Sequence, residues 1–351
     1  MDPGHRRSIA GALAAAALFG ASTPAAKLVG AEMHPFALAG LLYAGSGAGL
    51  SLWLLARRFA GARVSTGIAR PDLPWLAGAV LAGGAVAPAL LMFALAVTQA
   101  TVVSLLLNLE SVFTALLAWF LFRENFDRRI ALGMALIAGG GGVLSMTPGA
   151  LGQWNAGALL VAAACLFWAI DNNLTRRISA GDPISIAAIK GCVAAVTNLA
   201  LAALAGASCP DALSAIGALA IGLGGYGVSL ALFVVALRDL GAARTGAYFS
   251  TAPFVGVAIA IGALGEPAGP SFWLAAGLMA AGVWLHVSER HEHAHTHEQL
   301  DHEHAHAHDD HHRHMHDFAW DGTEPHVHPH RHLPMTHRHP HYPDIHHRHR
   351  H

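Results

Sequence analysis

Ten runs of about twenty mostly apolar residues constrain this chain more than any other feature. A helix of that length crosses the ~30 Å hydrocarbon layer of a bilayer. Backbone polar groups in lipid must be hydrogen-bonded within their own segment, so the runs predict helices rather than strands. Nearly every run is apolar on all faces, which excludes a soluble protein built from amphipathic helices. The expected spans are 8–26, 36–56, 73–96, 100–122, 129–147, 154–173, 184–205, 213–237, 241–264 and 270–288.

Composition divides the chain into two parts. Residues are 54% hydrophobic and 12% charged, whereas a soluble domain carries about a quarter charged residues. Of the 26 histidines, 23 lie between His291 and His351. The three cysteines form neither a disulfide framework nor a Cys-x-x-Cys metal site. A net charge of -1, without basic patches interleaved with aromatic residues, excludes a nucleic-acid-binding protein.

The distribution of Lys and Arg predicts the orientation in the membrane. With a cytoplasmic N-terminus, 14 cationic residues fall in inside loops or adjoining helix ends, and only Lys27 falls outside. An even number of spans returns the C-terminus to the cytoplasm. We therefore expect a multi-pass protein of the inner or plasma membrane with both termini cytoplasmic. A cleaved signal peptide over residues 6–21 is the alternative, against which the internal repeat argues.

The body of the chain repeats itself. Leu18-Phe19 followed by Pro35 reappears as Leu166-Phe167 followed by Pro183, an offset of 148 residues. Phe-Ala-Leu-Ala at 93–96 followed by Glu124 reappears as Val-Ala-Leu-Arg at 235–238 followed by Glu266, an offset of 142. Five helices per half is an odd number, so the halves should be inverted, as in many alternating-access transporters. We predict a first five-helix repeat over 1–148, a second over 149–290 and a tail over 291–351.

Three stretches resemble EamA-type permeases of the drug/metabolite transporter superfamily. They are Leu-Phe-Gly-Ala-Ser-Thr-Pro-Ala-Ala-Lys (18–27), Val-Phe-Thr-Ala-Leu-Leu-Ala-Trp-Phe-Leu-Phe-Arg-Glu (112–124) and the stretch from Ala252-Pro253 to Glu266. The resemblance spans about residues 8–288. It implies an all-α integral membrane protein with ten helices in two inverted halves, and a permease rather than an enzyme. The chain differs from the family pattern at one point. Such permeases commonly have a proline before the Val-Phe of the fourth helix, whereas this chain has Glu110-Ser111 there.

Polar side chains inside the spans are candidates for contacts with a substrate or coupling ion. Glu110 lies near the middle of its run, where an ionisable group costs ~3 kcal/mol or more, so it is interpreted as a proton-binding carboxylate or a structural hydrogen-bonded one. Asn108 lies two residues away and should occupy another helix face. Asp171 and Asn172 lie near the cytoplasmic end of the sixth run.

Lys190 lies about seven residues into the seventh run, in the same half of the membrane as Asp171. We hypothesise that it neutralises Asp171 or Glu110; a purely structural ion pair and snorkelling of Lys190 are the alternatives. Thr23 corresponds to Asp171 by the 148-residue offset, and the adjacent Pro24 can break the first helix. Broken helices at matching positions are typical of transporter binding regions.

Histidine recurs at every second position through much of the tail. Neutral imidazole binds zinc, copper, nickel and cobalt, so this segment predicts metal binding. With few apolar residues it should be disordered. A pH-responsive polycation and low-complexity drift are the alternatives. The candidate ligands are His291, His293, His295, His297, His302, His304, His306, His308, His311, His312, His314 and His316.

The leading hypothesis is a permease that moves a small solute or metabolite by alternating access, as proton-coupled efflux through Glu110, with no required cofactor. One alternative is a transition-metal transporter that the tail feeds or gates. Another is a membrane metal buffer or sensor that does not transport. The expected partners are the lipid bilayer and the solute; metal ions and a second copy in a homodimer are left open.

Overall fold

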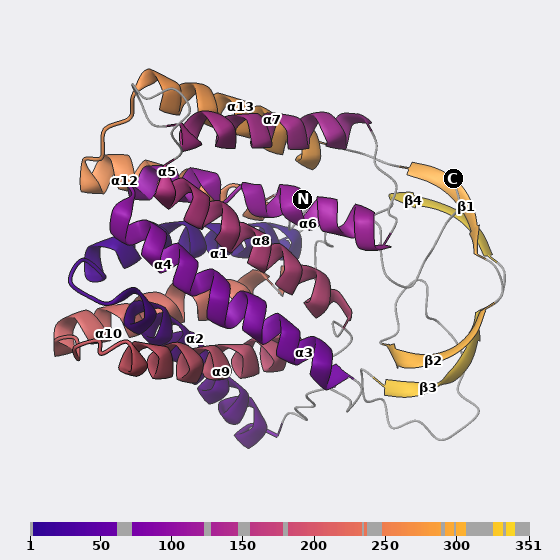
Figure 1. Cartoon of the computed structure of the whole chain (residues 1–351). Coiled ribbons are helices and arrows are strands. Elements are labelled where there is room, and N and C mark those ends of the chain that lie inside the picture. The colour runs from indigo at the N-terminus through magenta and orange to yellow at the C-terminus, as the bar shows by residue number, and fades with distance from the viewer. Residues whose placement is uncertain are drawn as a thin grey trace.

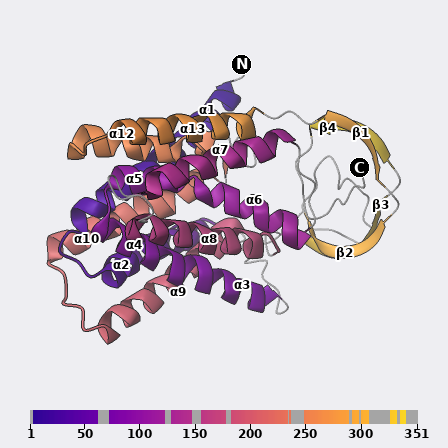
Figure 2. The same cartoon turned by 45° about the horizontal axis from the view of Figure 1, so that its top comes forward.

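The computed structural model describes residues 3–61, 72–122, 128–146, 155–177, 182–233, 235–236 and 248–288, and the backbone of four segments of the tail. Helices form one bundle, and the tail strands lie to one side of it (Figures 1 and 2). The first half contains α1 (Pro3–Val29), α2 (Pro35–Phe59), α3 (Leu73–Ala79), the π-helix η2 (Val80–Val86), α4 (Ala87–Val97), α5 (Ala100–Leu106), α6 (Leu109–Phe122) and α7 (Arg128–Ser145). The second half contains α8 (Ala156–Arg177), α9 (Pro183–Leu204), α10 (Ala212–Ile221), the π-helix η3 (Gly222–Val228), α12 (Ala252–Leu264) and α13 (Pro270–Val287).

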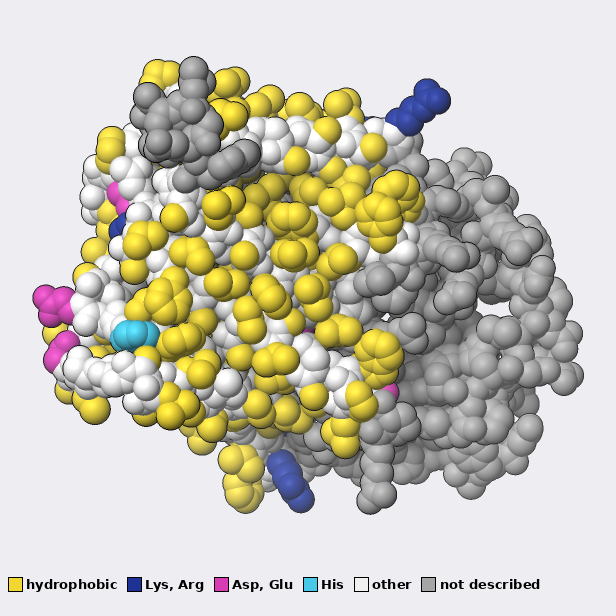
Figure 3. Space-filling model, in the orientation of Figure 1, with side chains coloured by type: hydrophobic (Ala, Val, Ile, Leu, Met, Phe, Trp, Pro, Cys, Tyr) yellow, Lys and Arg dark blue, Asp and Glu magenta, His cyan; other side chains and the backbone are white. Residues whose placement is uncertain are grey.

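Each of the ten expected runs contains a helix. Among the described residues, seven helical stretches are long and apolar enough to cross a membrane, and two apolar helices are shorter, Ala252–Leu264 and Pro270–Leu285. Large hydrophobic side chains such as Trp53, Val196 and Trp284 are exposed. Hydrophobic side chains cover the face of the helical body drawn in Figure 3, and charged ones lie mainly at its edges. This is the surface of a protein that lipid surrounds. The seven long stretches are Arg6–Val29, Pro35–Phe59, Leu73–Val97, Ala100–Leu117, Ala156–Thr175, Ile184–Leu204 and Ala212–Phe233.

The two halves have matching helix boundaries. Helices α2 and α9 both begin at a proline, Pro35 and Pro183, 148 residues apart. The π-helices η2 and η3 are each seven residues long and start 142 residues apart, at Val80 and Gly222. Helices α7 and α13 are each 18 residues long, with the same 142-residue offset. The offsets read from the sequence therefore recur in the positions of the helices.

The contacts between helices also pair equivalent elements. Helix α2 packs on α9, and α7 packs on α13, as both views show for the second pair (Figures 1 and 2). Helix α1 packs on α12, and α8 packs on α6; likewise α8 contacts η2, and α1 contacts η3. Exchanging the two halves leaves this set of contacts unchanged.

Glycines allow the central helices to approach closely. A Cβ on Gly191 of α9 would lie 2.9 Å from Gly47 Cα of α2. A Cβ on Gly45 would lie 2.0 Å from the Leu219 carbonyl oxygen, and one on Gly222 would lie 1.9 Å from the Leu42 carbonyl oxygen. Small residues at such crossings are the usual means of helix association in lipid, where hydrophobic driving force between helices is absent.

The expectation of a break in the first helix was wrong. Helix α1 continues through Pro24, because a proline removes only one donor and the rest of the hydrogen-bond ladder persists. The fourth run is instead broken between α5 and α6, at Leu107 and Asn108. The Leu105 carbonyl accepts both the Asn108 backbone N–H (3.2 Å) and the Asn108 side-chain amide (2.9 Å), and the Cys165 thiol of α8 lies 3.7 Å from the Leu106 carbonyl oxygen. The break therefore forms without a proline, because a tighter turn and side-chain donors satisfy the carbonyls at this point.

The expectation of a disordered tail was wrong for four segments. They form strands β1 (Glu292–His297), β2 (Leu300–His306), β3 (His326–His332) and β4 (Met335–Pro340). Strand β1 pairs antiparallel with β4, and β2 with β3. Histidine at every second position has the period of a strand, and strand pairing satisfies the backbone without a buried core.

Candidate functional site

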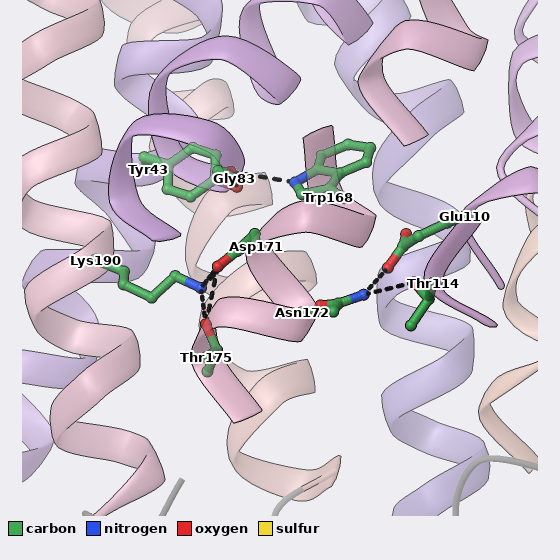
Figure 4. Close-up of polar contacts among 9 residues, drawn as sticks. All are labelled: Tyr43, Gly83, Glu110, Thr114, Trp168, Asp171, Asn172, Thr175 and Lys190. Carbon is green, nitrogen blue, oxygen red and sulfur yellow. Dashed lines mark hydrogen bonds and ion pairs between the residues drawn. The ribbon is translucent and has the colours of Figure 1, made fainter. Parts of the chain in front are cut away.

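Two neighbouring residues of α8, Asp171 and Asn172, form polar contacts in different directions (Figure 4). Consecutive helical residues are about 100° apart around the axis, so they meet different neighbours. Lys190 Nζ, on α9, lies 2.5 Å from Asp171 Oδ1 and 2.7 Å from Oδ2. The Asn172 amide donates to Glu110 Oε1, on α6, at 2.8 Å. Helix α8 thus forms one polar pair with α9 of the second half and another with α6 of the first half.

The Asp171–Lys190 ion pair is nearly enclosed. The side chains of Lys190 and Asp171 are 18% and 8% exposed. Thr175, one turn along α8, donates to Asp171 Oδ1 (2.9 Å) and accepts from Lys190 Nζ (3.2 Å). Of the two carboxylates considered as partners for Lys190, the structure places Asp171 against it. Pairing and additional hydrogen bonds offset the cost of removing these two charges from water.

The π-helix η2 lies directly against this ion pair. A Cβ on Gly83 would lie 1.9 Å from Asp171 Oδ2, so glycine is required for this approach. The Gly83 carbonyl accepts hydrogen bonds from the Tyr43 hydroxyl (3.2 Å) and the Trp168 indole N–H (3.1 Å). Asn198 of α9 donates to the next carbonyl, that of Gly84, at 2.9 Å. Side chains from α2, α8 and α9 therefore hold η2, a helix type common at functional sites.

Glu110 occupies the first turn of α6, immediately after the break. The N-terminus of a helix carries a partial positive charge, which favours a carboxylate there. Glu110 is half-buried, whereas its partner Asn172 is exposed. Asn172 also lies 3.4 Å from the Thr114 hydroxyl, one turn further along α6. The second pair is thus more open than the first, and its carboxyl group lies at a helix N-terminus instead of beside a cation.

The remaining two predicted site residues are not brought into these pairs. Asn108 is buried and its amide donates within its own turn, to the Leu105 carbonyl. Thr23 is buried in α1, and no hydrogen bond within the described part of the chain joins it to either pair. Thr175 and Thr114 were not predicted. Their spacing of four residues from Asp171 and from Glu110 is the signal that could have found them.

A third polar cluster lies where α5 begins. Both carboxylate oxygens of Glu266 accept backbone N–H groups, from Ala100 at 2.8 Å and Thr101 at 2.7 Å. Lys27 Nζ lies 3.8 Å from Glu266 Oε1 and donates to the Thr98 carbonyl. Glu266 therefore caps α5 from the other half of the molecule, a role that sequence reasoning missed. Glu124, its counterpart in the repeat, lies outside the described residues.

The structure does not test the predicted metal ligands, which all lie in the tail. Among the residues whose side chains it describes, no three His, Cys, Asp or Glu residues come together as a metal site. Six of the predicted tail ligands lie in β1 or β2, where only the backbone is described: His293, His295, His297, His302, His304 and His306. The other six lie outside the described residues: His291, His308, His311, His312, His314 and His316.

Long apolar helices with enclosed polar pairs define a multi-pass membrane protein. The model of the EamA-like transporter family matches residues 6–146 and again residues 155–288, so the chain belongs to this family. An uncharacterized transporter of Methanothermobacter thermautotrophicus is 31% identical over 207 residues, which are 57% of this chain and 60% of that relative. The chain thus spans about three fifths of the relative's length.

A protein of known crystal structure shares the fold. The match covers 80% of this chain and 96% of that protein, with a TM-score of 0.58 and 19% sequence identity.

The family match confirms the resemblance to EamA-type permeases that the sequence predicted.

Proposed function

We propose that this protein is a permease, not an enzyme, that moves a small solute or metabolite across the cytoplasmic membrane by alternating access. Its ten transmembrane helices form two inverted five-helix halves, with both termini in the cytoplasm. Three observations support this proposal: the family model matches twice, the π-helices η2 and η3 are offset by 142 residues, and the contacts α2–α9, α7–α13, α1–α12 with α8–α6, and α8–η2 with α1–η3 are preserved when the halves are exchanged.

The observation that carries the proposed mechanism is the position of α8 between the halves. Asp171 pairs with Lys190 of the second half, while Asn172 pairs with Glu110 of the first half. Rotation of one half against the other must change the distance between Asn172 and Glu110, because these residues belong to different halves, whereas Asp171 and Lys190 both belong to the second half. A solute that competes for Lys190 or Asp171 would act on this distance through α8, which holds both Asp171 and Asn172, and would so bias the equilibrium between the outward-open and inward-open states.

Glu110 is proposed as the proton-coupling residue, in the direction of efflux. The Asn172 amide donates to Oε1, an atom that accepts a hydrogen bond in both the ionised and the protonated carboxyl group. Proton binding at the other oxygen, Oε2, therefore does not break this contact. Because Asn172 is exposed, the pair is open to exchange with a proton donor outside the helix core.

The test is solute-dependent proton flux in proteoliposomes that contain the purified full-length protein and a trapped pH dye. A panel of small organic solutes is applied under an imposed pH gradient, and zinc, nickel and cobalt ions form a separate set. Glu110→Gln should abolish the solute-dependent proton flux but retain exchange of labelled solute for unlabelled solute. Lys190→Met should reduce both, and Glu32→Gln, which removes an exposed carboxylate, should reduce neither.

The outcomes separate the proposal from its alternatives. Flux of a metal ion without flux of any organic solute would replace the proposal with transition-metal transport. Solute-dependent proton flux that survives in Glu110→Gln would overturn the coupling role. The absence of any flux, with the protein folded in the membrane, would favour a membrane metal buffer or sensor.

A further inference from the structure

The register of the tail strands places histidines opposite histidines. In the β1–β4 pair, His293 is opposite His339 and His295 is opposite His337. The β2–β3 pair has three such positions: His302 opposite His330, His304 opposite His328 and His306 opposite His326. The alternation of histidine along the sequence does not by itself determine this strand register, because shifting one strand by one residue against its partner would place every histidine opposite another residue type.

Each strand pair consequently has one face that contains all of its histidines. Alternate residues of a strand share a face, and directly opposite residues of an antiparallel pair share it too. The β1–β4 face holds five histidines and Met335, and the β2–β3 face holds seven histidines, with His332 opposite Leu300. The opposite faces hold residues such as Glu292, Arg338, Asp301 and Arg331, and no histidine among the paired positions.

The spacing of these positions suits a tetrahedral metal ion. Cβ atoms of directly opposite residues are about 4.5–5.5 Å apart, and positions two apart on a strand are separated by roughly 6.6 Å. Two adjacent cross-strand pairs therefore place four histidine positions next to one another on one face of the strand pair. Zinc takes three or four such nitrogen ligands at about 2.0–2.1 Å, and imidazole also suits nickel and copper.

We propose that these two histidine faces bind divalent transition metals, each ion held by imidazoles from both strands of a pair. His302, His304, His328 and His330 form the central site of the β2–β3 face. The β1–β4 face forms a second site around His293, His295, His337 and His339. The proposed ligands thus include histidines of β3 and β4 in addition to those of β1 and β2. The proposal is independent of transport, because it requires only the tail's strand pairing.

Metal binding to the purified full-length protein in detergent tests this site. The protein is stripped with a chelator and titrated with Zn²⁺ against a chromophoric competitor, and with Co²⁺ for the visible absorption of a tetrahedral ion. One variant replaces the four central β2–β3 histidines: His302→Gln, His304→Gln, His328→Gln and His330→Gln. A matched control variant replaces the same number in the last six residues: His346→Gln, His347→Gln, His349→Gln and His351→Gln.

The strand-pair variant should lose one tight Zn²⁺ equivalent, with affinity at that site weakened about tenfold or more, and should lose part of the Co²⁺ tetrahedral band. The control variant should retain both signals. Equal losses in the two variants would show that a flexible chain chelates the metal through composition alone, and would overturn the proposal. So would unchanged Zn²⁺ affinity in the strand-pair variant. Neither readout depends on flux, so failure here is distinguishable from failure of the permease proposal.

Discussion

At the scale of single residues, the two polar pairs on α8 differ in how tightly they are held. Asp171 contacts Lys190 through both carboxylate oxygens and Thr175 through one of them. The absence of a side chain on Gly83 allows η2 to pack against this carboxylate. Glu110 has one amide partner and a helix N-terminus. A group with several fixed partners sets geometry, whereas one with a single neutral partner can gain or lose a proton with little rearrangement. This difference agrees with the proposed function, in which the first pair recognises the solute and the second couples transport to protons.

Gly83→Ala tests the close approach of η2 to the ion pair. The new Cβ would lie 1.9 Å from Asp171 Oδ2, so either the helix or the carboxylate must move. We expect a loss of about 1–3 kcal/mol in the free energy of unfolding and a loss of transport. Gly142→Ala is the control, because a Cβ there meets nothing within 4 Å. Unfolding in detergent is the measurement, and equal stability of the two variants would contradict the structure.

Asp211, which lies outside the membrane-spanning part, makes a pH-dependent contribution to the free energy of unfolding. Hydrogen bonds from Ser214 lower the pKa of its carboxyl group, which also accepts the Leu213 N–H at 3.0 Å as the N-cap of α10. The pKa is lower in the folded state, so the stabilisation is present above the unfolded-state pKa and is lost as pH falls through the folded-state pKa. In Asp211→Asn the apparent melting temperature should fall less steeply on acidification. If the melting temperature of Asp211→Asn falls with pH as steeply as that of the unmodified protein, Asp211 does not make this contribution.

At the scale of elements, irregular helices are the features that position the site. The break at 107–108 places Glu110 at a helix N-terminus, and η2 exposes carbonyls that other helices bind. The sequence predicted the elements that depend on local composition: the apolar runs, the offsets of 148 and 142 and the polar residues within the spans. It did not predict the break or the π-helices, because their stability depends on donors such as Cys165, Trp168 and Asn198 from distant helices.

The same reasoning explains the other differences from the sequence-based expectations. Pro24 was expected to break α1, but packing in the bundle maintains the helix around it. Lys27 was predicted only to lie on the outside of the membrane, and its contact with Glu266 depends on a residue from the other half. The tail was expected to be disordered from its low apolar content, whereas its period of two permits strand pairing. Long-range contacts account for each difference.

Asn198→Leu tests whether η2 depends on donors from α9. Asn198 is fully buried and donates to the Gly84 carbonyl at 2.9 Å. Removing the donor leaves a buried carbonyl without this partner, at a cost of about 1–3 kcal/mol. Thr197→Val is the neighbouring control, since the Thr197 hydroxyl donates only to Val193 of its own helix. If Asn198→Leu unfolds in detergent at the same temperature as the control, η2 does not require this contact.

At the scale of the whole molecule, equivalent parts of the two halves meet each other. Helices α2 and α9 pack together, as do α7 and α13, while α1 and α8 each pack on the fourth helix of the opposite half. In the proposed transport cycle, this arrangement would allow two related conformations in which the two halves exchange their conformations, as in other alternating-access transporters. The polar pairs break the symmetry, because Asp171 of α8 corresponds to Thr23 of α1.

The most direct test of the account compares Lys190→Met, Asp171→Asn and the double variant Asp171→Asn/Lys190→Met. Each single variant leaves one enclosed charge unpaired, which costs several kcal/mol, whereas the double variant removes both charges. The measurements are unfolding in detergent and flux of a transported solute in proteoliposomes. We expect the double variant to recover stability but not flux, because in the proposed function the pair contacts the solute. Recovery of both to the level of the unmodified protein would show that the ion pair is structural only and would contradict its proposed role in solute binding.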